Sequence, residues 1–317
     1  MPVDPLIAPL LAALNAQPAA PLDVALRRAE AARRQAAGSP YGQFTQPLAE
    51  VADVHEERIP VTSPTGEITV RIYRNADVLA GAPAGALVVY HGGGWIMGSL
   101  GDSDPRSRTI AAAADVVVVS ADYRLAPEFP FPTPVHDCYD ALTWTVANAG
   151  RLGFDPRRIG VAGESAGANL AAAVALLARE RGEPELRLQL LEIPGLDLTL
   201  DSPSVRTYGS GHLLPLDELR WCLGLYLGGH PATDPLASPV LATDLAGLPP
   251  AVILTAQCDP LADDGRRYAQ RLTGAGVEVR FTEHAGHVHG SHILTALLPT
   301  ARAWRDEVTD AVRHYLE

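Results

Sequence analysis

The sequence contains no lysine, so all 25 of its basic residues are arginine. Schiff-base chemistry, a Ser–Lys catalytic pair and a P-loop for phosphate each need a lysine amine, and all three are therefore excluded. Cysteine is also scarce: Cys138, Cys222 and Cys258 form an odd and widely spaced set. Such a set predicts free thiols, without a disulfide framework or zinc-binding spacing, in a reducing compartment. We therefore expect a cytoplasmic protein.

Long apolar runs and an excess of positive charge are missing as well. No stretch approaches the roughly 20 apolar residues that span a bilayer, and the N-terminal segment carries Asp4 but no basic residue, unlike a secretory signal. The formal net charge is −12, and nucleic acids and anionic membranes repel a negative surface. We expect neither as a partner. The expected partner is a small molecule, and a homodimer is compatible with the sequence.

Hydrophobic patterning divides the 317 residues into helices and strands. Apolar residues at helical spacing predict two helices within residues 1–45. Strand-like stretches follow at 54–61 and 68–74, and then Val-rich runs typical of strands that are buried on both faces of a parallel sheet. These later strands are expected at 86–90, 115–123, 157–163, 186–193, 250–256 and 277–284, with helices at 135–149, 166–182, 261–274 and 292–316. The alternation predicts an α/β fold with a mostly parallel central sheet flanked by helices.

Two segments do not fit this alternation and are interpreted as a small helical cap. One is residues 1–50, and the other is an insertion at about 200–230 that interrupts the rhythm of strands and helices. The remainder, residues 51–317, is expected to form one catalytic domain around the sheet.

The stretch 163–167 reads Gly-Glu-Ser-Ala-Gly and lies between a predicted strand and a predicted helix. G-x-S-x-G in this setting is the nucleophile elbow, a turn so tight that only glycine fits two residues before and after the serine. Ser165 is therefore the candidate nucleophile. The alternative is an ordinary strand–helix turn that contains serine by chance.

A second glycine-rich stretch, His-Gly-Gly-Gly-Trp at 91–95, directly follows a predicted strand. Glycines allow backbone N–H groups to point at a ligand, and such donors stabilise the oxyanion formed during acyl transfer. Gly93 and Gly94, together with Ala166, are the candidate donors, and His91 is expected to hold the loop in place. The alternative, a phosphate-binding loop, would need the G-x-G-x-x-G spacing, which is absent.

These motifs, taken together, resemble the hormone-sensitive-lipase family of α/β-hydrolase esterases, in its GDSAG-like bacterial group. The resemblance runs from about residue 54 to the C-terminus and includes DYRLAPEFPFP (122–132), GESAGANLA (163–171), ASPVLATDLAGLPPAVILTAQCDPLADDG (237–265) and HG (289–290). It implies an α/β-hydrolase fold and places the catalytic acid at Asp259. The sequence agrees, because Asp259 follows a predicted parallel strand at the sheet edge that also carries the nucleophile. Asp263 and Asp264 are the alternatives.

The candidate base lies among four histidines, His284, His287, His289 and His292. The family pattern G-x-x-H-G selects His289, with His287 as the alternative, and the roles of the other histidines stay open. The family usually has phenylalanine after this His-Gly pair, whereas this chain has Ser291, so the packing around the base is expected to differ. A metal site on this loop would lack a good set of ligands, and we expect neither a metal nor another cofactor.

The resemblance implies a serine carboxylesterase that acts on short- to medium-chain acyl esters. An amidase such as an arylformamidase, or a lactonase, could use the same three residues, and a non-catalytic ligand-binding receptor is a remote alternative. Candidate residues of the substrate pocket are Trp95, Glu164, His212 and Leu213. Glu164 stands where the family often has aspartate.

Overall fold

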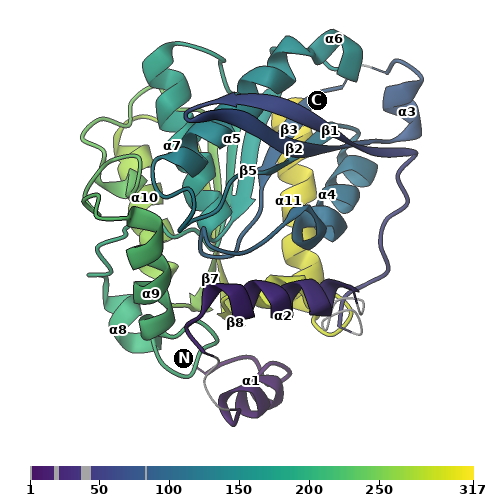
Figure 1. The fold of residues 1–317 in the computed structure, drawn as a ribbon. Helices are drawn as coiled ribbons and strands as arrows, with labels where there is room; N and C mark the ends of the chain where they lie inside the picture. The colour runs from purple at the N-terminus through teal and green to yellow at the C-terminus, as the bar shows by residue number, and fades with distance from the viewer. Residues whose placement is uncertain (1, 18–20, 37–43, 83) are drawn as a thin grey trace.

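The computed structural model describes residues 2–17, 21–36, 44–82 and 84–317, and it is built around one eight-stranded sheet (Figure 1). The strands lie side by side in the order β1-β2-β4-β3-β5-β6-β7-β8. The sheet is antiparallel where β1 meets β2 and where β2 meets β4, and parallel from β4 through to β8. The strands are β1 (Asp53–Thr62), β2 (Thr65–Arg74), β3 (Ala86–Tyr90), β4 (Val117–Asp122), β5 (Ile159–Glu164), β6 (Leu188–Glu192), β7 (Ala251–Cys258) and β8 (Val279–Val288). The predicted fold class is confirmed.

Helices cover both faces of the sheet. One face packs against α5, α7 and α10, and the opposite face packs against α4 and α11. The helices are α1 (Ala8–Asn15), α2 (Val24–Ala36), α3 (Ala76–Leu79), α4 (Leu100–Ala114), α5 (Thr133–Ala147), α6 (Ala149–Leu152), α7 (Ala166–Arg181), α8 (Pro203–Tyr208), α9 (Leu216–Leu227), α10 (Ala262–Gly274) and α11 (Pro299–Leu316). The layers explain why the parallel strands have continuous apolar runs, since both faces of these strands are buried.

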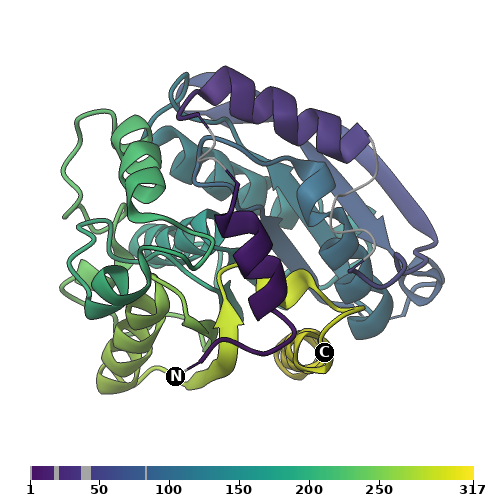
Figure 2. The same cartoon turned by 90° about the horizontal axis from the view of Figure 1, so that it is seen from below.

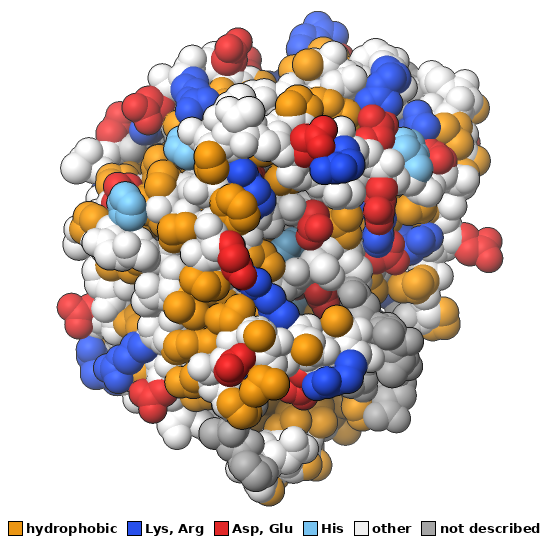
Figure 3. All heavy atoms as spheres, in the orientation of Figure 1, with side chains coloured by type: hydrophobic (Ala, Val, Ile, Leu, Met, Phe, Trp, Pro, Cys, Tyr) orange, Lys and Arg blue, Asp and Glu red, His pale blue; other side chains and the backbone are white. Residues whose placement is uncertain are grey.

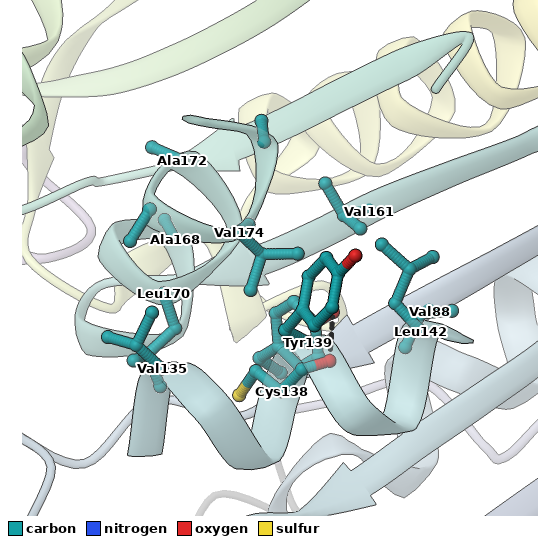
Figure 4. Packing of buried hydrophobic residues seen from close by; sticks show 14 of the residues in the cluster. Val88, Val135, Cys138, Tyr139, Leu142, Val161, Ala168, Leu170, Ala172 and Val174 are labelled. Carbon is teal, nitrogen blue, oxygen red and sulfur yellow. Dashed lines mark hydrogen bonds between the residues drawn. The ribbon is translucent and has the colours of Figure 1, made fainter. Parts of the chain in front are cut away.

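The helix α7, which begins at the candidate nucleophile, lies deepest in the molecule. Residues 166–178 of this helix are all buried, and most of them are alanine. Small side chains let the helix approach both the sheet and α5 closely. Figure 4 shows this contact, with Val135 of α5 beside Leu170 of α7. The candidate nucleophile therefore lies at the start of a helix that is buried in the core.

Three of the longer elements differ from the sequence-based expectations. No helix was expected at α4, whose first half contains Gly101 and Pro105 and whose apolar second half packs against the sheet. The last helix begins at Pro299 instead of residue 292, because a 3₁₀ turn, Ser291–Ile293, comes first and proline favours the first position of a helix. The strand β8 continues to Val288, past its expected end at residue 284.

The segments expected to form a cap contain α1 and α2 at the N-terminus and α8 and α9 in the insertion. Seen from below, α1 and α2 cross the end of the sheet toward which β7 and β8 point (Figures 1 and 2). The two segments are linked: Arg27 forms an ion pair with Glu218 at 2.9 Å, and the Asn15 side chain donates to the Gly211 carbonyl at 2.9 Å. The cap boundaries stay a prediction, and residues 18–20 and 37–43 of the expected N-terminal cap lie outside the described residues.

No helix in the described ranges is both long enough and apolar enough to cross a bilayer.

Candidate active site

Ser165 occupies the sharp turn between β5 and α7. Its backbone has φ 54° and ψ −116°, a conformation that costs a non-glycine residue about 1–3 kcal/mol. Two neighbouring glycines permit the turn: a Cβ atom on Gly163 would lie 2.3 Å from the Gly167 backbone, and one on Gly167 would lie 2.0 Å from the Tyr90 carbonyl oxygen. The Ser165 N–H donates to the Glu192 carbonyl at 2.9 Å, which ties the turn to β6.

The side chains of Asp259, His289 and Ser165 form a continuous hydrogen-bonded chain. The distance from His289 Nδ1 to Asp259 Oδ2 is 2.7 Å, and the distance from His289 Nε2 to Ser165 Oγ is 3.0 Å. A carboxylate can only accept, so Nδ1 carries the proton and Nε2 is left to accept the serine hydroxyl. The three residues follow β7, β8 and β5 directly, and parallel strands bring their carboxyl ends to one edge of the sheet.

An irregularity in β8 determines which histidine faces the acid. Ala256 pairs with His284 but Cys258 pairs with Val288, so β8 contains two more residues than β7 between these pairs. In a regular register Asp259 would lie opposite His287, whereas the bulge places His289 there. His287 is instead buried, with Nδ1 2.8 Å from Ser291 Oγ and Nε2 2.9 Å from the Thr300 hydroxyl.

The bulge is held by contacts that sequence reasoning did not anticipate. At its centre Gly286, with φ +72°, donates its N–H to the Gln257 side chain at 3.1 Å. The Gly286 carbonyl accepts the N–H of Asp4 at 3.0 Å, so the N-terminal segment crosses directly over it. Ser291 accepts the N–H of Val288 at 3.1 Å and donates to its carbonyl at 2.8 Å. A serine at position 291 thus fastens the loop by hydrogen bonds.

The alternative acids lie elsewhere. Asp263 accepts the backbone N–H of Ser204 at 2.8 Å and pairs with Arg266. Asp264 is buried and accepts two backbone N–H groups at 2.9 and 3.0 Å. Burial raises the pKa of Asp264 to about 8, and its hydrogen bonds offset this only in part. Asp259 is the acid that reaches His289.

The glycine-rich loop after β3 presents free backbone donors. Gly93 and Gly94 have φ values of +117° and +61°, and a Cβ atom on Gly93 would lie 2.3 Å from the Met97 carbonyl oxygen. Within the described ranges no acceptor takes the N–H groups of Gly93 and Gly94, and Ala166 carries the first N–H group of α7, which has no partner inside the helix. These donors and the positive end of the α7 dipole suit a developing oxyanion.

His91 holds this loop in place through a hydrogen bond and ring stacking. Its Nδ1 lies 2.7 Å from the Gly92 carbonyl oxygen, and its ring stacks on Tyr123 with 4.2 Å between centroids. The Tyr123 hydroxyl donates to the His91 carbonyl at 2.8 Å. Burial lowers the pKa of His91, which favours the neutral ring. These contacts agree with the expected structural role.

The candidate pocket residues lie at different places. Trp95 is buried and stacks on Tyr226 of α9, with centroids 4.5 Å apart. His212 and Leu213 lie in the loop between α8 and α9, where Leu213 is 38% exposed. Glu164 is the candidate brought closest to the reacting groups, because its carboxylate accepts a hydrogen bond from the base loop. Among the described residues no group of three or more His, Cys, Asp or Glu could hold a metal ion.

Comparisons with known proteins identify the family to which this chain belongs. Residues 87–293 match the α/β-hydrolase fold family. The chain is 42% identical over 250 residues to carboxylesterase NlhH of Mycobacterium tuberculosis, covering 78% of each chain. It is 39% identical over 225 residues to an arylesterase of Saccharolobus solfataricus, covering 70% of this chain and 72% of that one. The hyperthermophilic esterase of the archaeon Pyrobaculum calidifontis superimposes with a TM-score of 0.90 at 36% identity, covering 99% of both chains. The chain therefore belongs to the α/β-hydrolase fold family, and its resemblance to the hormone-sensitive-lipase esterases is confirmed.

Proposed function

We propose that this protein is a serine carboxylesterase that hydrolyses short- to medium-chain acyl esters through Ser165, His289 and Asp259. The observation that carries the proposal is the hydrogen-bonded chain from Asp259 through His289 to Ser165, at 2.7 and 3.0 Å. The relatives named as carboxylesterase and arylesterase support the same class of substrate.

In the first half of the reaction the serine becomes acylated. Ser165 Oγ attacks the ester carbonyl while His289 Nε2 takes its proton. Asp259 accepts a hydrogen bond from the Nδ1–H group and stabilises the imidazolium that forms. The carbonyl oxygen gains a negative charge and receives hydrogen bonds from Gly93, Gly94 and Ala166. Collapse of this intermediate breaks the ester bond, and His289 returns its proton to the leaving alcohol.

In the second half a water molecule replaces the alcohol. His289 takes a proton from the water, whose oxygen attacks the acyl-enzyme, and the same backbone donors hold the second oxyanion. The serine then leaves with the proton from His289, and the carboxylic acid departs. Every proton transfer therefore passes through one nitrogen, His289 Nε2.

The test uses a serine-directed fluorophosphonate and a panel of esters, amides and lactones. We expect the reagent to label Ser165 and abolish ester turnover, and we expect Ser165→Ala to be inactive and unlabelled. Full activity after labelling elsewhere would overturn the assignment. Faster turnover of an amide or a lactone than of any ester would favour the corresponding alternative, and labelling without turnover of any substrate would favour a binding protein.

A further inference from the structure

Glu164, the residue before the candidate nucleophile, contacts the other two parts of the site. Its carboxylate Oε2 accepts a hydrogen bond from His292 Nε2 at 3.0 Å. Its side chain also lies against the oxyanion loop, because a Cβ atom on Gly92 would come within 3.3 Å of Glu164 Cγ and 3.4 Å of Oε1. One side chain on the nucleophile turn therefore contacts both the base loop and the oxyanion loop.

His292, the partner of Glu164, lies three residues after the base and is held in one protonation state. Its side chain is 2% exposed, and its Nδ1 has no hydrogen-bond partner among the described residues. The carboxylate of Glu164 can only accept, so the single proton of a neutral ring belongs on Nε2. A second proton on Nδ1 would be buried without an acceptor, which is costly. Burial also lowers the pKa of His292, although Glu164 opposes this.

The contacts of His292 lead back to the nucleophile by a second route. Its ring stacks on Trp304 of α11, with centroids 5.2 Å apart. The Trp304 indole N–H donates to the buried Glu192 carboxylate at 2.7 Å, and the Glu192 carbonyl accepts the N–H of Ser165 at 2.9 Å. The contacts thus form a closed ring through Ser165, Glu164, His292, Trp304 and Glu192. A closed ring of packed groups resists displacement of any one member.

The charge of Glu164 has the sign that the reaction needs. Burial alone would raise the pKa of Glu164, but its interaction with His292 and the positive charge of Arg106 outweigh burial and lower the pKa to about 2. The carboxylate is therefore ionised at neutral pH. A negative charge near His289 stabilises the imidazolium that forms when Ser165 attacks.

We propose that Glu164 and His292 are positioning residues that together hold the nucleophile turn, the base loop and the oxyanion loop in their reactive arrangement. The proposal rests on the proposed esterase function, because its effect is on the rate of acyl transfer. Neither residue transfers a proton. Glu164 acts through Ser165 and the oxyanion loop, and His292 acts through Glu164.

The test measures kcat and KM for p-nitrophenyl butyrate in single and double variants. Misplacement of reacting groups by about 1 Å costs on the order of 100-fold, so we expect His292→Ala and Glu164→Ala each to lower kcat by about 10- to 100-fold. KM should change by less than about threefold, because in this proposal both residues act on the arrangement of the reacting groups and not on ground-state binding of the substrate. The double variant should lose little more than the worse single variant, since either change breaks the same ring.

Two conservative variants separate positioning from packing. His292→Gln keeps an N–H donor for Glu164, and we expect it to recover most of the activity lost in His292→Ala. Glu164→Gln keeps the acceptor but removes the charge, and its kcat should lie between those of the wild type and Glu164→Ala. Glu164→Gln also replaces one atom by another of similar size, so it keeps the test valid if the alanine variants do not fold.

His284→Ala is the matched control. His284 also stacks on Trp304, with centroids 4.0 Å apart, but its ion-pair partner is Glu307 and not Glu164. We expect this variant to keep kcat within about threefold of wild type, because His284 is not a member of the closed ring of contacts. An equal loss of kcat in His284→Ala and His292→Ala would show that the effect comes from general packing against Trp304, and it would overturn the proposal.

The outcome distinguishes this proposal from the proposed function. A wild-type protein that hydrolyses no ester contradicts the function. An active wild type with unchanged kcat in both Glu164→Ala and His292→Ala leaves the function standing and overturns the positioning role. A kcat loss in the double variant equal to the product of the two single losses would also overturn the proposal, because the two residues would then act independently.

Discussion

Ser165 combines a strained backbone with a side chain that is hydrogen-bonded to His289, and both features depend on its immediate neighbours. The positive φ of 54° is tolerated because the glycines on either side leave room for the turn. The tautomer of His289 depends in the same way on Asp259, which accepts from Nδ1 and leaves Nε2 free to accept. At the scale of single residues, the site is defined by which groups can donate and which can only accept.

Substitution of the two candidate bases, His289 and His287, should have different effects on kcat and on stability. His289→Ala removes the proposed proton acceptor, and we expect kcat to fall by about 10⁶-fold, as loss of the catalytic histidine does in serine proteases. His287→Ala should keep kcat within about tenfold but lower the free energy of unfolding by about 2–4 kcal/mol, because it leaves a cavity and removes buried hydrogen bonds. The measurements are steady-state kinetics and urea unfolding. An inactive but stable His287→Ala protein would show that the register of β8 has been misassigned.

Asp264 predicts a loss of stability toward alkaline pH. Its pKa is raised by burial from 3.8 to about 8 in the folded protein, so the folded state keeps a proton that the unfolded chain releases near pH 4. The resulting stability is complete below that pH and is lost as the pH rises toward 8. Asp264→Asn keeps an oxygen acceptor for the two backbone N–H groups and cannot ionise. We expect its melting temperature to exceed that of the wild type increasingly between pH 5 and pH 9, and parallel curves would contradict this.

At the scale of elements, the bulge in β8 matters most for the site, because it places His289 opposite Asp259. The ends of β5 and β7 could be predicted to within two residues from apolar runs, and with them the sheet edge that carries Ser165 and Asp259. The bulge could not, because its partners are a side chain on β7 and the distant segment at Asp4. The base was chosen by resemblance for this reason, since a regular register would favour His287. The contact between Glu164 and His292 spans 128 residues and leaves no mark on local periodicity.

Gly286→Ala tests whether the bulge positions the base. Gly286 has φ +72°, and an added Cβ atom would lie 2.9 Å from the backbone nitrogen of Asp4. We expect kcat for p-nitrophenyl butyrate to fall by about tenfold or more, because the loop that carries His289 must shift.

Gly276→Ala is the control for backbone strain alone. Gly276 has a similar φ of +78° but nothing within 4 Å of its added Cβ atom. Both variants should lose about 1 kcal/mol of stability to the unfavourable φ, and only Gly286→Ala should lose activity. Equal kinetics in the two variants would mean that the bulge does not control the base.

At the scale of the whole molecule, the core is extensive and the segments expected to form a cap are small. The described helices of these segments are short: α1 has 8 residues, α2 has 13, α8 has 6 and α9 has 12. Acidic and basic side chains are interspersed over the surface in Figure 3, with apolar side chains gathered toward its lower part. Arg28 of α2 donates to the Ile96 and Ala126 carbonyls at 2.8 and 2.7 Å, which fastens the cap beside the oxyanion loop. The fold class could be predicted at this scale because the strands and helices of the core carry many regularly spaced apolar residues. The segments expected to form the cap have weaker hydrophobic patterning.

A slight cap predicts a preference for short acyl chains. Each buried methylene contributes about 0.8 kcal/mol, and only where an apolar wall can reach it. We expect kcat/KM to be highest for short acyl groups and to fall for long ones across p-nitrophenyl esters from acetate to palmitate. A triolein emulsion should give no jump in rate above the solubility limit. A maximum at the longest chains, or such a jump, would identify a true lipase with a larger apolar lid.

The contact between Asp4 and Gly286 also has a consequence for the order of events during translation. A ribosome makes the nucleophile turn and the oxyanion loop long before it makes β8, and domains fold as the chain emerges. The bulge that selects His289 needs both the early Asp4 segment and the late β8 segment, joined by the hydrogen bond at 3.0 Å. The proposed base is therefore in place only after the segment around Asp4 has met the much later strand β8. We expect hydrolytic activity only from chains in which this contact has formed.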